Sequence, residues 1–447
     1  MAKGRHILCS SPLSRSWVRE GDSLAEAGGR PGGLWSLLQA MGSWRTAAVA
    51  LLSFSSGLPL GLVLIAIPDW MRSIGVDIRV VGLFALTQAP WTFKVCWAPL
   101  LERYRLPWLG RRRGWTALMQ IALLVATLGL AGVGHHPEAL WVVSALALAV
   151  ACASATQDIA IDAYAVEILL PTEQGIAVGA RTAVYRAAMY ISGGLSITLA
   201  GRYSWPLVNI GLALFYVPLL WVTWKAPEPE TQVAAAPSLR DAVWGPLREV
   251  FHRPRALEIL AFVCLYKLAD NLAGALLRPF LIDLHYSEFD RGVGLATIGL
   301  VTALGGTFLG GLLTTVAGLG HSLWIGGFLQ IISNLGYILL ADSAPNRALL
   351  IGAMAFENLT QGMGTGAFSV LLLRLTQKRF SATQYALFSS LFGLPRLWSG
   401  PLSGFLVNAM GWKAFFWLTI VAGIPGLLLL HRFAPLGVRE PTLVEST

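Results

Sequence analysis

The chain has 447 residues, of which 55% are hydrophobic and 13% are charged, and its mean hydropathy is +0.62. A soluble protein of this length has a very different composition, so soluble enzymes and soluble binding domains are excluded and a membrane protein is predicted. The formal net charge of +9 does not indicate nucleic-acid binding, because the basic residues gather in short loops where membrane topology explains them.

The N-terminal region precedes the first long apolar segment. The first 40 residues contain no continuous apolar core of the kind that a signal peptide has. We expect a flexible cytoplasmic tail here. The alternative is an upstream start that overextends the chain, since Met41 comes just before the first apolar segment.

Apolar segments long enough to cross a bilayer then recur along the chain. Twelve are predicted, at residues 45–68, 79–101, 115–134, 139–162, 175–199, 206–225, 257–281, 293–317, 322–341, 347–373, 382–407 and 412–432. A polar, proline-rich interval separates the first six from the last six, as in a two-lobed secondary transporter. We predict an all-α membrane protein with five parts: a tail (1–43), a six-helix lobe (44–225), a cytoplasmic linker (226–256), a second six-helix lobe (257–433) and a C-terminal tail (434–447).

The linker contains one amphipathic stretch, residues 238–252. At helical spacing, one face carries Leu239, Val243, Trp244, Leu247 and Phe251, which predicts a helix lying on the inner leaflet.

Positive charge collects in alternate loops. It lies between the second and third segments (Arg103, Arg105, Arg111, Arg112, Arg113), in the linker, and after the tenth segment (Lys378, Arg379). The intervening loops have few such residues. The positive-inside rule therefore places both termini in the cytoplasm.

Ionisable residues inside apolar segments are costly and indicate pairing or function. In chain order, Asp69 and Arg278 end equivalent segments at the outer surface, and we expect them to form a periplasmic gate pair. Glu102 and Arg103, followed by Arg111–Arg113, resemble a stretched form of the loop motif of major facilitator transporters, with Glu in place of the usual Asp. They predict a cytoplasmic gate; for the three later arginines, a role in topology alone is the alternative.

The fourth segment carries Asp158 and Asp162 on one face, because they are four residues apart. Lys94 has a depth similar to that of Asp158, and Arg181 lies near the level of Asp162. We predict that Asp162 is a gate residue paired with Arg181. For Asp158, proton coupling and structural pairing stay open.

Near the membrane midplane the sequence places Arg186, Lys267 and Glu357, with Arg396 somewhat beyond it. Three cations and one acid suit an anionic substrate, since arginine can bind a carboxylate in bidentate fashion. The alternative is that Lys267 simply pairs with Asp270 or Glu357. The four cysteines show no metal-binding spacing, and there is neither a nucleotide-binding motif nor a nucleophile with a base nearby. We expect no cofactor, no metal and no enzyme activity.

Several motifs resemble those of AmpG-type muropeptide permeases, in the peptide/acetyl-coenzyme A transporter branch of the major facilitator superfamily. They are FSSGLPLGL (54–62), FKVCWAPLLERY (93–104), GRRRGW (110–115), ASATQDIAIDA (153–163), YKLAD (266–270), FENLTQGMGTGAF (356–368), FSATQYALFSS (380–390) and PRLWSGPLSG (395–404). The resemblance covers about residues 44–433 and implies a major facilitator fold.

The resemblance further implies proton-driven import of N-acetylglucosaminyl-1,6-anhydromuramyl peptides across the bacterial inner membrane, for peptidoglycan recycling and β-lactamase induction. It implies proton coupling at Asp158, Asp270 and Glu357, and substrate contacts at Gln157 and Asn358 beside Arg186, Lys267 and Arg396. The expected partners are the anionic substrate, protons and lipid, and we expect a monomer. Some family members carry extra helices that this chain lacks. Import of siderophores or transport of acetyl-coenzyme A stays an alternative.

Overall fold

In the computed structural model of the protein, the described residues are 42–74, 76, 84–106, 109–133, 140–228, 238–287, 290 and 298–442. Within these ranges every named element is a helix. Buried side chains fill the interior of the molecule, and many large apolar side chains are exposed on its outside, as expected for helices that meet lipid.

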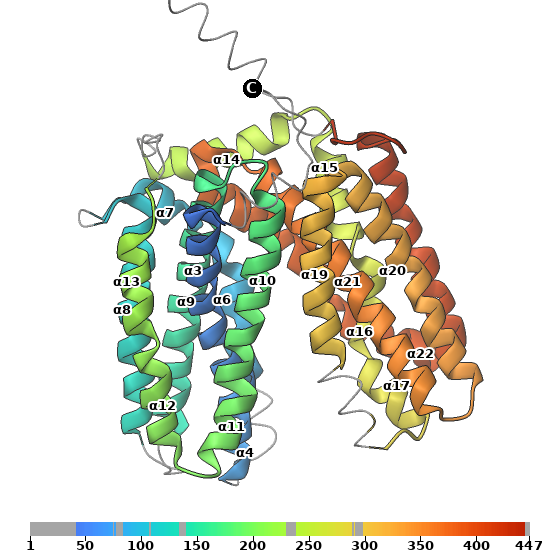
Figure 1. Ribbon diagram of the computed structural model, residues 1–447, viewed down its shortest axis with the longest axis horizontal. Coiled ribbons are helices and arrows are strands. Elements are labelled where there is room, and N and C mark those ends of the chain that lie inside the picture. Colours follow the sequence, from blue (N-terminus) through green and yellow to red (C-terminus); the bar gives the residue numbers. More distant parts are fainter. Residues whose placement is uncertain are drawn as a thin grey trace, which may run out of the picture.

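The first half of the chain forms one bundle of helices (Figure 1). Its elements are α3 (Trp44–Gly61), η2 (Leu62–Ala66), α4 (Ile67–Ser73), η3 (Ala85–Gln88), α6 (Ala89–Phe93), η4 (Lys94–Cys96), α7 (Ala98–Arg103), α8 (Arg111–Gly132), α9 (Leu140–Ile168), α10 (Gln174–Tyr190), η6 (Ile191–Leu195), α11 (Ser196–Ala200), α12 (Trp205–Leu214) and α13 (Tyr216–Lys225). The predicted second segment is a series of short helices, because Pro90 and Pro99 each begin a new helix at its first or second position.

The second half forms a second bundle beside the first (Figure 1). It contains α15 (Ala256–Leu265), α16 (Leu268–Ala275), α17 (Leu277–Asp283), α19 (Gly299–Val316), α20 (Leu319–Asp342), α21 (Arg347–Leu375), η8 (Lys378–Phe380) and α22 (Ser381–Phe433). The α22 run contains a kink at Gly411, whose φ of 77° is left-handed and favours glycine. A break between α15 and α16 lies at Lys267, whose φ of −107° and ψ of 8° are not helical.

Among the described residues, eight helical runs are long and apolar enough to cross a membrane. They are Trp44–Met71, Arg111–Gly132, Leu140–Ile168, Trp205–Lys225, Ala256–Asp283, Gly299–Val316, Leu319–Asp342 and Lys378–Phe433. The last run covers two of the predicted segments. The broken second segment, α10–α11 and α21 do not meet the same criterion. The protein is therefore a multi-pass membrane protein, with eight candidate membrane-spanning runs among its described residues.

Helix α14 (Leu239–His252) lies across one end of the two bundles (Figure 1). We call this the linker end of the molecule and the opposite end the far end. Ser238 caps the helix by accepting a hydrogen bond from the Asp241 amide at 3.1 Å. Trp244 and Phe251 are 63% and 56% exposed, so the predicted apolar face is present and uncovered. Burial lowers the pKa of Arg253, which follows α14 and donates to the Leu375 carbonyl.

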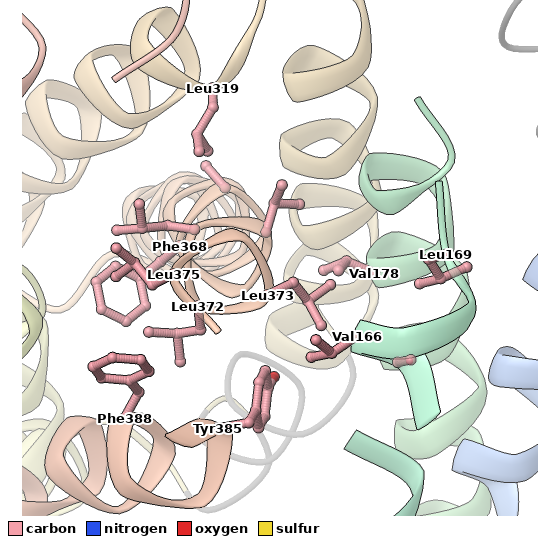
Figure 2. Packing of buried hydrophobic residues seen from close by; sticks show 14 of the residues in the cluster. Val166, Leu169, Val178, Leu319, Phe368, Leu372, Leu373, Leu375, Tyr385 and Phe388 are labelled. Carbon is pink, nitrogen blue, oxygen red and sulfur yellow. The ribbon is translucent and has the colours of Figure 1, made fainter. Parts of the chain in front are cut away.

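The two bundles meet through a shared apolar cluster at the linker end. Figure 2 shows Val166 and Val178 of the first bundle beside residues of the second, and Leu169 belongs to the same cluster. Their partners in the cluster are Leu319, Phe368, Leu372, Leu373, Leu375, Tyr385 and Phe388. Separate apolar clusters lie inside each bundle nearer the far end, where the ribbons diverge (Figure 1). Contact between the bundles is therefore concentrated at the linker end.

The C-terminal tail folds back over the linker ends of α19 and α20. The Gly320 amide donates to the Arg439 carbonyl at 2.8 Å, and the Arg439 guanidinium donates to the Val316 carbonyl at 2.7 Å. The next residue, Glu440, pairs with Arg374 at the end of α21. Arg374 also donates to the side chain of Gln174, at the start of α10 in the first bundle.

Candidate functional site

A buried network of charges joins the two bundles at the linker end. Arg112 binds Glu102 at 2.9 Å and Glu167 at 2.8 Å, and Arg111 binds Glu167 at 2.7 Å. Ser381, the first residue of α22, accepts from Arg112 at 2.7 Å and donates to Glu167 at 2.5 Å. We call these five residues the latch. Four come from the first bundle and Ser381 from the second, so the network holds the bundles together.

Glu102 also caps α22 directly. Its Oε1 atom accepts hydrogen bonds from the Ala382 and Thr383 amides, at 2.6 and 3.2 Å. The first amides of a helix lack partners within the helix and carry its positive dipole end, so a carboxylate there stabilises the contact. The side chains of Glu102 and Arg112 are each 1% exposed. The pair is therefore shielded from solvent, and removing one member leaves the other charge buried.

The latch differs in membership from the sequence prediction. Arg103 makes no ion pair with any described residue, and its guanidinium lies 5.8 Å from the ring centre of Tyr104. Arg111 and Arg112 take its place, so they do more than set topology. Glu167 is not among the predicted site residues, yet its side chain is 7% exposed and central to the latch. Depth along α9 could not reveal this, because its partners come from the starts of α8 and α22.

Close packing of glycines reinforces the contact beside the latch. A Cβ atom on Gly175 of α10 would lie 2.2 Å from the Gly311 carbonyl oxygen of α19. A Cβ atom on Gly311 would meet the Gly175 carbonyl oxygen at 2.1 Å. Only glycine permits the two backbones to approach so closely. The helices are thus in direct contact at the linker end.

Asp162 is held by two cations. Its Oδ2 atom lies 3.2 Å from Lys94, and its Oδ1 atom lies 2.5 Å from Arg181. The predicted pairing with Arg181 is therefore present. Lys94, which the sequence placed opposite Asp158, binds Asp162 instead.

Asp158 makes no ion pair with any described residue. It hydrogen-bonds with Ser56 of α3, one helical turn away from Asp162 along α9. The first bundle therefore contains one paired and one unpaired carboxyl in adjacent turns.

The second bundle repeats this arrangement. Lys267 donates to Asp270 Oδ2 at 2.7 Å and to the Gln361 carbonyl of α21 at 2.9 Å. The predicted alternative of pairing with Asp270 is therefore observed. Glu357 is 4% exposed, and its Oε2 atom has no hydrogen-bond partner among the described residues. Lys267 is also 4% exposed, so its charge is enclosed by the bundle.

Two arginines of the helix bundles have no described carboxylate within ion-pair distance. Arg186 belongs to α10 of the first bundle, and Arg396 to α22 of the second. Arg396 is exposed and Arg186 is partly buried. The two guanidinium groups are close enough to affect each other electrostatically, although they belong to different bundles. Two neighbouring arginines without counter-ions can bind an anion.

The remaining predicted residues lie in different surroundings. Gln157 is 0% exposed and donates to Ser55, while its own oxygen atom has no described partner. Asn358 donates to the Met354 carbonyl in its own helix at 2.8 Å. Asp69 is exposed near the far end. The side chain of Arg278 lies outside the described residues, so the predicted pair of Asp69 with Arg278 stays a prediction.

Comparison with known proteins identifies the family to which this chain belongs. The sequence profile of the Major Facilitator Superfamily matches residues 49–400. The anhydromuropeptide permease of Escherichia coli K12 is 38% identical over 388 residues, covering 86% of this chain and 79% of the relative. An uncharacterized protein of Haemophilus influenzae is 35% identical, covering 87% and 94%. An AmpG-named transporter of Rickettsia felis is 30% identical, covering 87% and 96%.

Solved structures show the same fold at low sequence identity. A bacterial homologue of the iron transporter ferroportin, in its outward-facing state, gives a TM-score of 0.68 at 14% identity, covering 87% of this chain and 98% of that one. The human organic anion transporter MFSD10 gives 0.65 at 15% identity, covering 87% and 99%. The chain therefore belongs to the major facilitator superfamily, and within it to the family of AmpG-type permeases, which are transporters and not enzymes.

Proposed function

We propose that this protein imports anhydromuropeptides across the bacterial inner membrane, driven by the proton gradient, for peptidoglycan recycling. The observation that carries the proposal is the 38% identity to the E. coli anhydromuropeptide permease over 86% of the chain. The two arginines without counter-ions support an anionic substrate, because the peptide part of a muropeptide carries carboxylates. In bacteria with an inducible chromosomal β-lactamase, the same import supplies the inducing signal.

We further propose the topology that the sequence predicts. The chain crosses the membrane twelve times in two six-helix lobes, with both termini and the latch at the cytoplasmic face. In this orientation the linker end is cytoplasmic, and α14 lies on the inner leaflet. Because the described inter-bundle contacts gather at that end, the conformation faces the periplasm. The Asp69 and Arg278 pair then belongs to the opposite, inward-facing state. We propose that the protein works as a monomer.

Substrate binding is assigned to Arg186 and Arg396, with Lys267, Asn358 and Gln157 contributing in other conformations. One arginine comes from each lobe, so a bound carboxylate can bridge them when the lobes close. Asp158, Asp270 and Glu357 are assigned to proton coupling. Buried carboxyls that can gain or lose a proton are the usual basis of such coupling.

The decisive experiment is uptake of a defined, labelled anhydromuropeptide into proteoliposomes that contain the purified protein. Uptake should require an inward proton gradient and should disappear when an uncoupler collapses it. A parallel assay with a ferric siderophore and with acetyl-coenzyme A tests the alternatives. Transport of either compound in place of the muropeptide would refute the proposed substrate.

Variants test the assigned residues. Arg186→Ala and Arg396→Ala should each weaken substrate binding by removing a charge-assisted contact worth about 2 kcal/mol, or roughly 30-fold. Arg202→Ala, at an exposed position after α11, is the control and should bind normally. Normal binding by both arginine variants would show that the substrate site is elsewhere.

Asp158→Asn should lower proton-driven uptake more than it lowers substrate binding, because it removes an ionisable carboxyl from the first bundle.

A further inference from the structure

The break between α15 and α16 is fastened to α21 by one side chain. Lys267 sits in the break, and its ammonium donates to Asp270 Oδ2 at 2.7 Å and to the Gln361 carbonyl at 2.9 Å. Its backbone φ and ψ of −107° and 8° show that the helix is interrupted at this residue. Because the side chain that anchors the break belongs to the break itself, any change in its partners acts directly on the backbone there.

Glu357 lies one turn before Gln361 on α21, and therefore on the same face of that helix. It is 4% exposed, and no described cation lies within ion-pair distance of it. Its Oε2 atom has no hydrogen-bond partner. An ionised carboxylate in this position would have lost water without gaining a counter-ion, which is strongly unfavourable.

A serine lies beside this carboxyl. The Ser333 hydroxyl of α20 lies 2.8 Å from the Gln330 carbonyl of its own helix. The same hydroxyl lies close enough to the Glu357 carboxyl to share a hydrogen bond. Because a hydroxyl can donate or accept, Ser333 can serve either protonation state of Glu357, and it brings no counter-charge.

Glu357 has several charged and titratable neighbours. Lys267 and Asp270 form a pair of net zero charge beside it. Tyr337 of α20 lies close enough to be affected electrostatically by Glu357, and Arg396 of α22 lies close enough to affect Lys267. Helix α19 packs against α21 and has no ionisable residue in its sequence. Among the described residues, Glu357 is thus the carboxyl of this cluster without a counter-ion.

We propose that Glu357 is a proton-binding site that controls the break between α15 and α16 through Lys267. In the protonated state, Lys267 and Asp270 neutralise each other and the ammonium holds the break against α21. When the proton leaves Glu357 for water, two carboxylates compete for one ammonium. Lys267 then moves toward Glu357, releases the Gln361 carbonyl, and allows α16 to reorient relative to α15. This inference rests on the proton coupling proposed above.

The break can be tested without any substrate. Spin labels at Leu257→Cys and Ile282→Cys, both exposed positions on either side of the break, report its geometry in an otherwise cysteine-free protein. The distance measured by double electron–electron resonance should change between acidic and alkaline buffer. In Glu357→Gln it should stay at the acidic value in both buffers. Glu258→Gln, in α15 and paired with Arg432, is the matched control and should keep the pH response.

A transport assay provides the second readout. Glu357→Gln should lose muropeptide accumulation driven by a pH gradient and keep exchange of muropeptide across proteoliposomes that carry no gradient. Retained exchange also shows that the variant is folded. Gradient-driven accumulation by Glu357→Gln, or an unchanged pH response of the labelled break, would overturn the inference. If the unsubstituted protein responds to pH in the labelling experiment but carries no muropeptide, the proposed substrate fails and the proton site stands.

Discussion

Among its five residues, the latch depends most on Glu102, because this carboxylate both binds arginines and caps α22. Glu102→Gln keeps the shape and removes the charge, leaving Arg112 with one counter-ion in place of two. Breaking a buried pair in this way should cost about 3 kcal/mol of the stability of the latched conformation. We expect the population to shift toward the state that is open at the linker end.

The shift can be measured by maleimide labelling of Tyr385→Cys in an otherwise cysteine-free protein. Tyr385 is 7% exposed in the apolar cluster between the bundles, so labelling reports separation of the bundles. Glu228→Gln is the matched control: it removes a surface ion pair with Arg113 outside the latch, from a side chain that is 46% exposed. Equal labelling of the two variants would contradict the role given to Glu102.

Ser381 should matter less than Glu102, because it contributes hydrogen bonds and no charge. In Ser381→Ala, Glu167 keeps both arginine partners and loses only the hydroxyl. The expected cost is about 1 kcal/mol. Ser389→Ala, which removes a hydroxyl bonded within α22 itself, is the control. In the same labelling assay, the extent of maleimide labelling should be highest in Glu102→Gln, lower in Ser381→Ala and lowest in the control. More labelling in Ser381→Ala than in Glu102→Gln would contradict this account.

At the element scale, the contact between α10 and α19 has no room for a side chain at Gly175. Gly175→Ala should push the two helices apart and disfavour closure at the linker end, at a cost of about 1–3 kcal/mol for overpacking. Gly305→Ala is the control on α19, because nothing lies within 4 Å of its added methyl group. There alanine should be neutral or stabilise the helix by about 0.5 kcal/mol. Thermal unfolding in detergent and the labelling assay together distinguish the two variants.

The continuous helices could be predicted from the sequence, whereas the interrupted helices and the long-range contacts could not. Apolar length predicted α8, α9, α20 and α21 well, because each is continuous. It could not foresee that the second segment is broken into short helices or that the C-terminal tail packs on α19 and α20. Those features depend on contacts between residues far apart in the chain. For the same reason, the sequence predicts Glu102 and the pair of Asp162 with Arg181 as gate residues, but does not predict Glu167 and Ser381 as partners of Glu102 and Arg112.

At the scale of the whole molecule, the proposed topology makes a direct prediction. Alkaline phosphatase folds to an active form only outside the cytoplasm. Fusions after His136 and Ala344 should therefore be active, and fusions after Glu230 and Lys378 inactive, since loops with many positive charges stay inside. Fusions that are all expressed but show the reverse pattern would invert the orientation and move the latch to the periplasmic face.

The C-terminal tail has a practical consequence for anyone shortening or extending this chain. The last long apolar run ends at Phe433, where α22 ends. Cutting there would remove Arg439 and Glu440, leaving the Gly320 amide without its acceptor and Arg374 without its carboxylate. Arg374 in turn reaches Gln174 in the other bundle. The shortened protein would thus lose contacts close to the interface between its two bundles. Purification tags should therefore follow the C-terminal tail, behind a spacer.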